Sequence, residues 1–426
     1  MDGNQDDIYE QSGDVEQLHQ SLVDQLKQRE LITDPRVEAA FRAVPRHLFL
    51  PALAPEEVYR DEAIPTKMLN GTAISSSSQP AIMAIMLEQL QLQPGQRVLE
   101  IGAGTGYNAA LLAHIVGETG QVVTIDIDED IVADARTHLA QTGFERVEVI
   151  CADGGNGYLP LAPYDRIILT VSAGDITPAW REQLKPDGLL LLPLKLRDPQ
   201  VSVVFEQAGD HLASVSVRAC GFMMLRGAFA EPTFRVQLGP DPLLFLGMSE
   251  PRELDTDALY RWLTGPSRDI STHLQLTPRE LFFGLHMWLA LHEPDYCQLV
   301  ADRSMVERGT VPQLFSLFSP NKYTSSFGLL GESGICVLSH PPLPSSTGEM
   351  MASMPRFEIL VKSFGSDETL ATRLLEHIAT WNAAGRPTEE NLHINAYPHD
   401  SGYRPSPGET ILQKQWTQLA VRWDHP

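Results

Sequence analysis

A glycine-rich stretch between two regular elements is the part of the sequence best suited to bind a cofactor. Gly102, Gly104 and Gly106 separate a short apolar run from a helical stretch that starts near Tyr107. Glycines at such a junction let the backbone approach a ligand closely, and they turn the first amides of the helix toward it. The spacing is GxGxG rather than the GxGxxG of dinucleotide sites, and Glu100 closes the apolar run. This pattern favours S-adenosylmethionine over a dinucleotide.

Acidic residues at two later strand ends fit the same ligand. Asp126 follows the loop by about twenty residues and ends the second apolar run, where a carboxylate can accept hydrogen bonds from ribose hydroxyls. Asp153, which precedes Gly154, ends the third run and is placed to receive the adenine amino group. The acids at 128–130 stand in the first turn of a helix, where they favour its dipole, and we give them no ligand role. The predicted cofactor-binding residues are Glu100, Gly102, Gly104, Thr105, Gly106, Asp126, Asp153 and Gly154.

These residues require a sheet whose strand ends meet at one edge. Short apolar runs alternate with longer helical stretches, a pattern typical of buried parallel strands. The runs are residues 98–101, 122–125, 147–151, 166–171 and 189–194. The predicted fold class is α/β, with a doubly wound Rossmann-like sheet. Two helices precede it, one over residues 15–29 and one that starts at Pro35 with Asp34 as its N-cap.

The chain is longer than one such domain requires. Its 426 residues allow about two or three domains, and Pro and Gly clusters between 239 and 251 mark a boundary. Beyond it, Thr277 and Glu280 form a capping box that opens a long apolar helix. A strand at 357–361, a helix and a strand at 392–396 predict a βαβ-like unit in a second α+β domain. The predicted division is an acidic tail (1–14), a methyltransferase domain (15–230) and a C-terminal α+β domain for substrate recognition (231–426).

The amino-acid composition limits the classes of molecule that the protein can bind. The formal net charge of -23 leaves no basic footprint for nucleic acid. No window approaches about 18 consecutive apolar residues, which argues against a membrane span, and the acidic N-terminus is unlike a secretory signal. The four cysteines form no CxxC pair, and His286 and His292 do not share a helix face, so no metal site is expected. We expect a cytoplasmic protein without metal, nucleic-acid or membrane partners.

Several motifs together resemble the protein-L-isoaspartate O-methyltransferase family. The matching stretches are residues 36–49, 59–65, 73–80, 100–107, 153–154 and 165–168. They occur in the family's order, and the resemblance covers about residues 15–230. It implies the fold, S-adenosylmethionine as cofactor, and transfer of a methyl group to a carboxylate.

Two departures from that family lie on the substrate side. The family has one serine between Ile and Gln-Pro, whereas this chain has four, so the family's active-site serine corresponds to either Ser75 or Ser78. The family's Phe-Val-Pro-Leu strand is replaced by Phe-Met-Met-Leu-Arg-Gly at 222–227. The further substrate-side candidates are Thr72, Gln79 and Ser172. Because the cofactor motifs are intact, these departures put the substrate in question and not the chemistry.

A carboxylate is already a nucleophile at neutral pH, since its pKa lies near 4, so methyl transfer from a sulfonium needs no general base. The protein would contribute in-line positioning and exclusion of water. Serine hydroxyls can orient the carboxylate oxygens, whereas a Lys or Arg clamp would quench their nucleophilicity. The competing interpretation is that the four serines are a flexible, solvated loop.

Three hypotheses follow. The first is repair, in which L-isoaspartyl carboxylates of damaged proteins are methylated. The second is tailoring, in which the C-terminal domain recognises a dedicated ribosomally made peptide and an aspartate in it is methylated, which can lead to a succinimide. The third is a non-catalytic binding protein on a methyltransferase scaffold, and the cofactor acids argue against it. In the first two, the partner is a protein or peptide that carries an isoaspartyl or aspartyl carboxylate.

Overall fold

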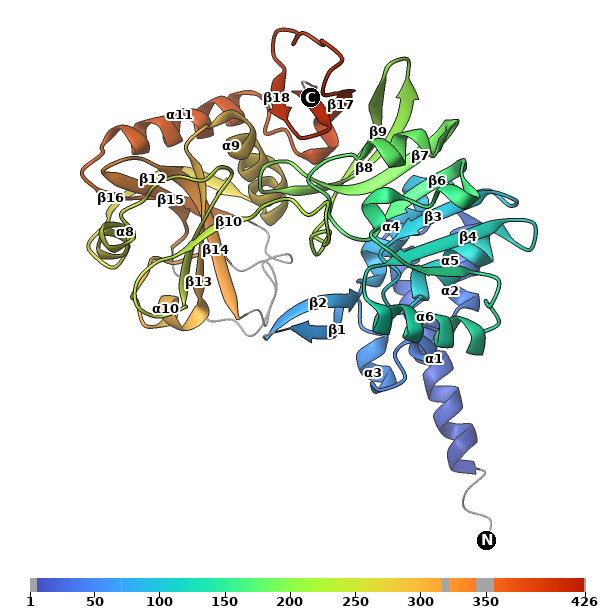
Figure 1. Ribbon diagram of the computed structural model, residues 1–426. Coiled ribbons are helices and arrows are strands. Elements are labelled where there is room, and N and C mark those ends of the chain that lie inside the picture. Colours follow the sequence, from blue (N-terminus) through green and yellow to red (C-terminus); the bar gives the residue numbers. More distant parts are fainter. Residues whose placement is uncertain (1–5, 70, 316–321, 342–355, 425–426) are drawn as a thin grey trace.

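The computed structural model describes residues 6–69, 71–315, 322–341 and 356–424 (Figure 1). The first five residues of the predicted acidic tail lie outside the described residues. Helix α1 (Asp6–Gln28) begins earlier than its apolar spacing predicted, and it takes in the rest of that tail. Helix α2 (Pro35–Ala43) has the predicted cap, since the Asp34 carboxylate accepts the Arg36 amide at 2.8 Å.

The main sheet has ten strands. They are β3 (Arg97–Ile101), β4 (Gln121–Asp126), β5 (Glu148–Cys151), β6 (Tyr164–Leu169), β7 (Leu184–Lys195), β8 (Gln200–Ala208), β9 (His211–Ala219), β17 (Leu392–Pro398), β18 (Thr410–Gln413) and β19 (Thr417–Trp423). Their order is β18-β19-β17-β9-β8-β7-β6-β3-β4-β5. The five predicted strands are β3 to β7, and they pair in parallel. The other five strands pair antiparallel.

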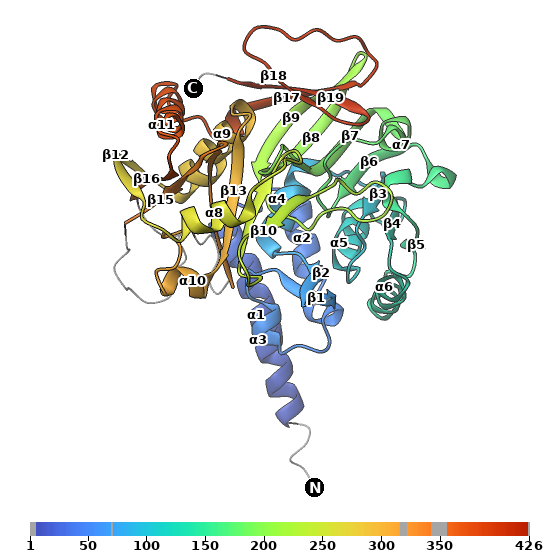
Figure 2. The ribbon, with the colours of Figure 1, turned by 60° about the vertical axis from the view of Figure 1, so that its left-hand side comes forward.

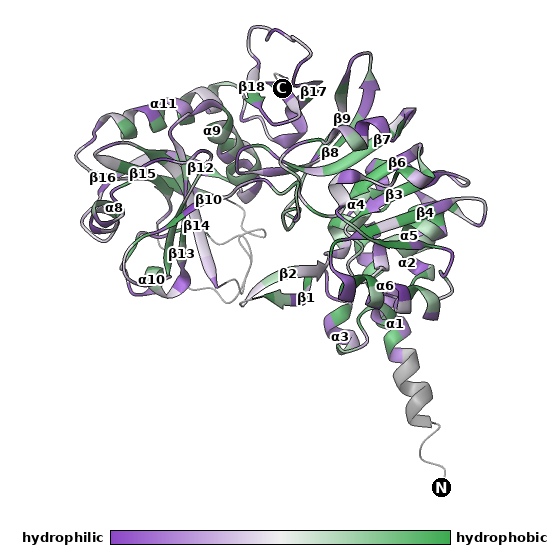
Figure 3. Ribbon diagram, in the orientation of Figure 1, coloured by the Kyte–Doolittle hydropathy of each residue, from purple (hydrophilic) through white to green (hydrophobic). Residues whose placement is uncertain are grey.

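Helices cover both faces of the main sheet. They are α4 (Pro80–Leu90), α5 (Tyr107–Val116), α6 (Glu129–Gln141) and α7 (Pro178–Glu182), with the short turns η1 (Arg46–Phe49), α3 (Pro55–Val58), η2 (Gly154–Asn156) and η3 (Leu159–Leu161). One face of the strands, which includes Val98, packs on α1, α2, α4, α5 and α6. The opposite face, which includes Leu99, packs on Trp180 of α7. Burial on both faces explains the continuous apolar runs of the parallel strands, much of which is green in Figure 3.

A second, antiparallel sheet forms most of the C-terminal region. Its strands are β10 (Phe234–Gln237), β11 (Leu244–Met248), β12 (Arg268–Leu276), β13 (Tyr296–Asp302), β14 (Tyr323–Leu330), β15 (Gly334–Ser339) and β16 (Phe357–Gly365), in the order β10-β11-β13-β14-β15-β16-β12. Its helices are α8 (Thr256–Leu263), the π-helical η4 (Glu280–Leu285), α9 (His286–His292), α10 (Arg303–Glu307) and α11 (Thr369–Ala383). We call this sheet and these helices the second unit. Its presence matches the predicted α+β fold class.

The predicted capping box opens η4, because Thr277 Oγ1 accepts the Glu280 amide at 3.1 Å and the Glu280 carboxylate accepts the Thr277 amide at 2.7 Å. The helix continues into α9, whose Met287 and Leu291 pack against the main sheet. The second unit is therefore joined to the main sheet by a shared apolar core.

The predicted βαβ-like unit is wrong. Strand β16 lies in the second sheet, whereas β17 lies in the main sheet, where Asn395 and Ala396 pair with Ala213 and Leu212 of β9. Figure 2 shows β17, β18 and β19 continuing the main sheet beyond β9. Alternating apolar residues predict that a strand exists but carry no information on its partner. Helix α11 thus connects the two sheets instead of crossing within one.

Candidate functional site

A cleft of about 2370 Å³ runs between the carboxyl ends of the central strands and the second unit. Its walls include the glycine loop (residues 102–106), the serine segment (residues 75–78) and α4. Residues of the second unit line the same cleft, among them Arg279, Phe282, Phe283, His286, Gln298 and Phe327. The cleft thus brings together the predicted cofactor loop, the predicted substrate loop and part of the C-terminal region.

The glycine loop needs glycine for two separate reasons. Gly102 and Gly106 have positive φ angles of 106° and 86°, which other residues rarely adopt. A Cβ on Gly102 would also lie 2.5 Å from the Thr170 hydroxyl, so a side chain there would collide with the neighbouring strand end. Gly102, Gly104 and Thr105 line the cleft, and Gly106 caps α5 behind them. Three of the four loop residues predicted to bind cofactor therefore face the cleft.

Asp126, the predicted ribose acceptor, ends β4 and lies at the cleft. Its side chain lines the cleft, one carboxylate oxygen accepts the Gly104 amide at 3.1 Å, and the other accepts the Asp128 amide at 3.3 Å. Burial raises the pKa of Asp126 despite these hydrogen bonds. A carboxylate has about four acceptor positions, so two backbone contacts leave capacity for a pair of hydroxyls.

Glu100 does not line the cleft. Its carboxylate is fully buried and accepts hydrogen bonds from Asn108 Nδ2 at 2.7 Å and from Thr124 Oγ1 at 2.6 Å. Burial raises the pKa of Glu100 to about 7. These two contacts tie β3 to α5 and β4, so the side chain holds the base of the glycine loop instead of touching a ligand.

Asp153 is also engaged by backbone amides. Its two carboxylate oxygens accept the Gly155 amide at 3.1 Å and the Ala228 amide at 2.7 Å. Gly154, its neighbour, lines the cleft, and a Cβ there would lie 2.4 Å from Ile101. Asp153 therefore shapes the loop that flanks the cleft, and Gly154 is the residue that faces the ligand space.

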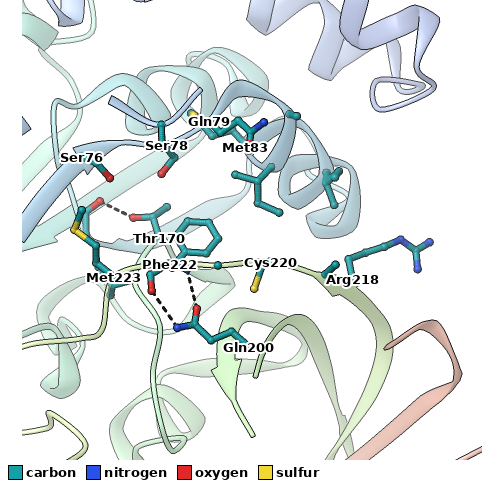
Figure 4. A pocket seen from close by; sticks show the side chains of 18 of the residues that line it. Ser76, Ser78, Gln79, Met83, Thr170, Gln200, Arg218, Cys220, Phe222 and Met223 are labelled. Atoms are coloured by element: carbon teal, nitrogen blue, oxygen red, sulfur yellow. Dashed lines mark hydrogen bonds between the residues drawn. The ribbon is translucent and has the colours of Figure 1, made fainter. Parts of the chain in front are cut away.

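The serine segment is mostly a strand and not a flexible loop. Strand β2 (Thr72–Ser77) pairs with β1 (Ile64–Leu69), with Ser75 opposite Lys67. All four serines line the cleft. The Ser75 hydroxyl accepts from Thr66 Oγ1 at 3.1 Å, whereas Figure 4 shows the Ser78 hydroxyl directed toward the pocket. A run of four serines has no apolar alternation that would predict a strand, so the sequence alone did not indicate β2.

Arg46 organises the end of the serine segment, and the sequence analysis did not single it out. Its guanidinium is fully buried and donates to the carbonyls of Val58 at 2.9 Å and Ser78 at 3.0 Å. Burial lowers the pKa of Arg46 from its ordinary value. The available signal was a charged residue between the apolar pairs Val44-Pro45 and Leu48-Phe49. Arg46 thus fixes the backbone on which Ser78 sits.

The three further substrate-side candidates lie in different places. Gln79 lines the cleft and donates to the Asp61 carbonyl at 2.9 Å. Thr72 is exposed at the far end of β2, away from the glycine loop. Ser172 is fully buried and does not line the cleft. Thr170, two residues before Ser172, faces the pocket in its place (Figure 4).

The wall opposite the serine segment is apolar. We call residues 222–225, Phe-Met-Met-Leu, the acceptor wall, and all four line the cleft. Figure 4 shows Phe222 and Met223 across the pocket from Ser78, Gln79 and Met83. Apolar surfaces around a bound carboxylate exclude water and strengthen the few hydrogen bonds that orient it.

The methyltransferase-like part of the chain matches a known family. Residues 16–228 match the family model described as Protein-L-isoaspartate(D-aspartate) O-methyltransferase (PCMT). The chain belongs to this family. The predicted resemblance, the methyltransferase activity and the S-adenosylmethionine cofactor are confirmed by that membership.

Curated relatives match about half of the chain. Protein-L-isoaspartate O-methyltransferase 2 of Archaeoglobus fulgidus is 36% identical over 222 residues, which are 52% of this chain and 99% of that protein. The Methanopyrus kandleri enzyme is 39% identical over 215 residues, which are 50% of this chain and 93% of that protein. A solved protein-L-isoaspartate O-methyltransferase aligns over 88% of this chain and 96% of its own, with a TM-score of 0.49 and 22% identity.

The cleft residues fit S-adenosylmethionine as the family requires. The open first turn of α5 follows Gly106, which has no side chain to cap it, so its amides can approach a carboxylate. Asp126, the residue predicted to accept hydrogen bonds from ribose hydroxyls, ends the next strand and lines the same cleft. Among the described residues, no group of three His, Cys, Asp or Glu side chains could hold a metal ion. In the same part of the chain, no helix is long and apolar enough to cross a membrane.

Proposed function

We propose that this protein is a carboxyl O-methyltransferase that acts on isoaspartyl or aspartyl carboxylates in proteins or peptides. The observation that carries the proposal is that the serine segment and the glycine loop line one cleft, with Asp126 on the cofactor side and Ser78 on the substrate side. S-adenosylmethionine supplies an electrophilic methyl group. The protein's own residues hold the acceptor in line with it.

The residues around the acceptor suit a nucleophile that is already charged. Ser78 and Thr170 offer hydroxyls, and the acceptor wall is apolar. The hydroxyl of Thr170 donates to the Gly102 carbonyl at 2.7 Å, so a serine hydroxyl has to donate to the substrate oxygen, and we assign that role to Ser78. Neutral donors orient a carboxylate without the charge neutralisation that an arginine would impose. The arrangement therefore needs no general base.

The size of the cleft favours a polypeptide substrate. Small-molecule sites typically occupy roughly 300–1,000 Å³, whereas this cleft measures about 2370 Å³. The serine segment and residues of the second unit both line it. A stretch of extended chain on either side of the modified residue is a ligand of that size.

A second candidate, tailoring of a dedicated peptide, is favoured by the second unit's share of the cleft. Phe282, Phe283 and Phe327 add an aromatic wall that lies outside the family match at 16–228, and Arg279 lines it together with its partners Glu389 and Glu390. Arg279 is half exposed and pairs with Glu389 at 2.7 Å. Aromatic and arginine side chains are the types that most often anchor a bound peptide. We propose that this wall selects the sequence that surrounds the methylated residue.

Labelled S-adenosylmethionine separates the candidates. The protein is incubated with a generic isoaspartyl peptide, with its aspartyl counterpart, and with peptides encoded near its gene. Label in the generic isoaspartyl peptide supports repair, and label confined to a neighbour-encoded peptide supports tailoring. Failure to bind S-adenosylmethionine in calorimetry would reject both enzyme candidates and favour the non-catalytic scaffold.

A further inference from the structure

The acceptor wall is held in place from two sides. On one side the Ser172 amide donates to the Met223 carbonyl at 2.7 Å, and the Leu225 amide donates to the Ser172 carbonyl at 2.7 Å. On the other side, the side chain of Gln200 makes the backbone hydrogen bonds that a neighbouring strand would otherwise make. Gln200 accepts the Phe222 amide on Oε1 at 2.7 Å and donates from Nε2 to the Phe222 carbonyl at 3.1 Å. Figure 4 shows this two-point contact as dashed lines.

Gln200 stands at the start of β8, just after a turn that the second unit holds. Two residues earlier, the Asp198 carboxylate accepts from the Tyr296 hydroxyl at 2.7 Å and lies 3.1 Å from His286 Nε2. Arg197 of the same turn donates to the Ala290 carbonyl at 2.9 Å. Two side chains, His286 of α9 and Tyr296 of β13, and the backbone carbonyl of Ala290 therefore hold the turn that precedes Gln200.

The groups around the Asp198 carboxylate favour its ionised form. Burial by itself would raise its pKa, but the hydrogen bonds from His286 and Tyr296 outweigh that effect and the pKa is lowered. Lys195 of β7 also lies near enough to favour the charged form. Phe327 stacks on the His286 ring, with 4.2 Å between centroids, and fixes its plane. The contacts of Asp198 with His286 and Tyr296 thus connect the second unit to the main sheet.

We propose that Gln200 is a positioning residue for methyl transfer, and that the second unit acts on the acceptor wall through it. His286 and Tyr296 anchor Asp198, and Gln200 follows two residues later at the start of β8. Gln200 in turn fixes the backbone of Phe222 beside the acceptor carboxylate. The inference rests on the proposed function for its catalytic consequence. It gives the C-terminal region a role inside the active site in addition to any role in recognising sequence around it.

Glutamine suits this position because it both accepts and donates. A Gln200→Ala variant leaves the Phe222 amide and carbonyl without that partner. A Gln200→Glu variant still accepts the Phe222 amide but cannot donate to the carbonyl. Displacements of about 1 Å can cost roughly a hundredfold in rate, so we expect kcat/KM for a methylated peptide to fall by at least tenfold in Gln200→Ala and by less in Gln200→Glu, with unchanged affinity for S-adenosylmethionine.

Amide hydrogen exchange tests the contact without any substrate. Exchange at residues 220–226 should be faster in Gln200→Ala than in the wild type. Gln207→Ala is the matched control, because Gln207 lies on the same strand and donates only to the Gly209 carbonyl. Unchanged exchange in Gln200→Ala would overturn the inference even if activity fell. If the wild type methylated none of the peptides, the proposed function would fail while the exchange result would still decide whether Gln200 holds the wall.

A double-variant cycle tests the connection to the second unit. Tyr296→Phe removes one hydroxyl from the Asp198 contact and conserves the ring. If the second unit acts through Gln200, Tyr296→Phe should lower kcat/KM severalfold in the wild type and have little further effect in Gln200→Ala. Independent, multiplicative losses would overturn this route. Faster exchange at residues 220–226 in Tyr296→Phe is the accompanying result that the route requires.

Discussion

Thr417, in the last strand of the main sheet, donates its hydroxyl to the carboxylate of Asp175 at 2.5 Å. The amide of Trp416 donates to the same carboxylate at 2.7 Å. Asp175 follows β6 in the part of the chain that matches the methyltransferase family, and it is almost fully buried. Residues of β19 and the residue before it therefore donate hydrogen bonds to a buried carboxylate of the part that matches the family. These bonds join the C-terminal strands to that part.

We expect a chain that ends at residue 391 to lose its fold. It would lack β17, β18 and β19, and with them the buried side chains Leu392, Ile394, Leu419 and Val421. Each buried aliphatic side chain contributes about 1.5–3 kcal/mol, so the loss is comparable to the total stability of about 5–15 kcal/mol of a folded protein. The truncated protein should aggregate or unfold in size-exclusion chromatography and circular dichroism. A chain that ends at residue 424 is the control, and equal melting temperatures for the two would contradict the prediction.

The local elements of the catalytic part could be predicted because their causes are local. Apolar runs give β3 to β7, the Asp34 carboxylate caps α2, and Thr277 with Glu280 caps η4. The positions of Gly102 and Asp126 at the cleft could be predicted because strand ends and glycine spacing are visible in a single chain. These predictions depend on residues that are near one another in sequence.

The features that could not be predicted from the sequence depend on contacts between residues that are far apart in the chain. Strand β17 pairs with β9, about 180 residues away, and no local pattern identifies that partner. Glu100 was assigned to the cofactor because it precedes the glycine loop, yet Asn108 and Thr124 turn its carboxylate into the core. The contact of Gln200 with Phe222 joins two segments whose separate sequences give no sign of it.

Asp126→Ala should strongly weaken binding of S-adenosylmethionine. A hydrogen bond to a charged group is worth about 1.5–3 kcal/mol, so losing contacts to two ribose hydroxyls should weaken the affinity by roughly a hundredfold or more. Asp126→Asn keeps one acceptor oxygen and should lie between the wild type and Asp126→Ala. Isothermal titration calorimetry measures the affinities, with Asp130→Asn as an exposed acidic control on α6. Wild-type affinity in Asp126→Ala would refute the ribose role.

Ser78→Ala and Ser75→Ala should differ in turnover. Ser78 directly precedes Gln79. Arg46 fixes its backbone, and its hydroxyl points into the pocket (Figure 4). Ser75 instead accepts from Thr66 within the hairpin. We expect Ser78→Ala to lower kcat by roughly 10–100-fold, the value of one hydrogen bond to a carboxylate, and Ser75→Ala to change it little. Single-turnover methylation with saturating S-adenosylmethionine is the measurement, and wild-type rates in both variants would reject a serine role.

The buried carboxyl of Glu100 should make the stability of the protein depend on pH near neutrality. Its pKa is raised by burial from 4.5 to about 7. Because the folded state has the higher pKa, the contribution of Glu100 to stability is fully present below about pH 4.5 and is lost as the pH rises through about 7. At about 1.36 kcal/mol per pKa unit, the free energy of unfolding should fall by roughly 2–3 kcal/mol between pH 5 and pH 8 on account of this group.

Glu100→Gln removes that dependence, since the amide is neutral at both pH values and can still bond to Asn108 and Thr124. Urea denaturation at pH 5 and pH 8 should therefore show a smaller difference in Glu100→Gln than in the wild type. Glu206→Gln, on an exposed position of β8, controls for the general titration of surface acids. Parallel pH profiles for the wild type and Glu100→Gln would show that the buried carboxyl does not titrate near pH 7.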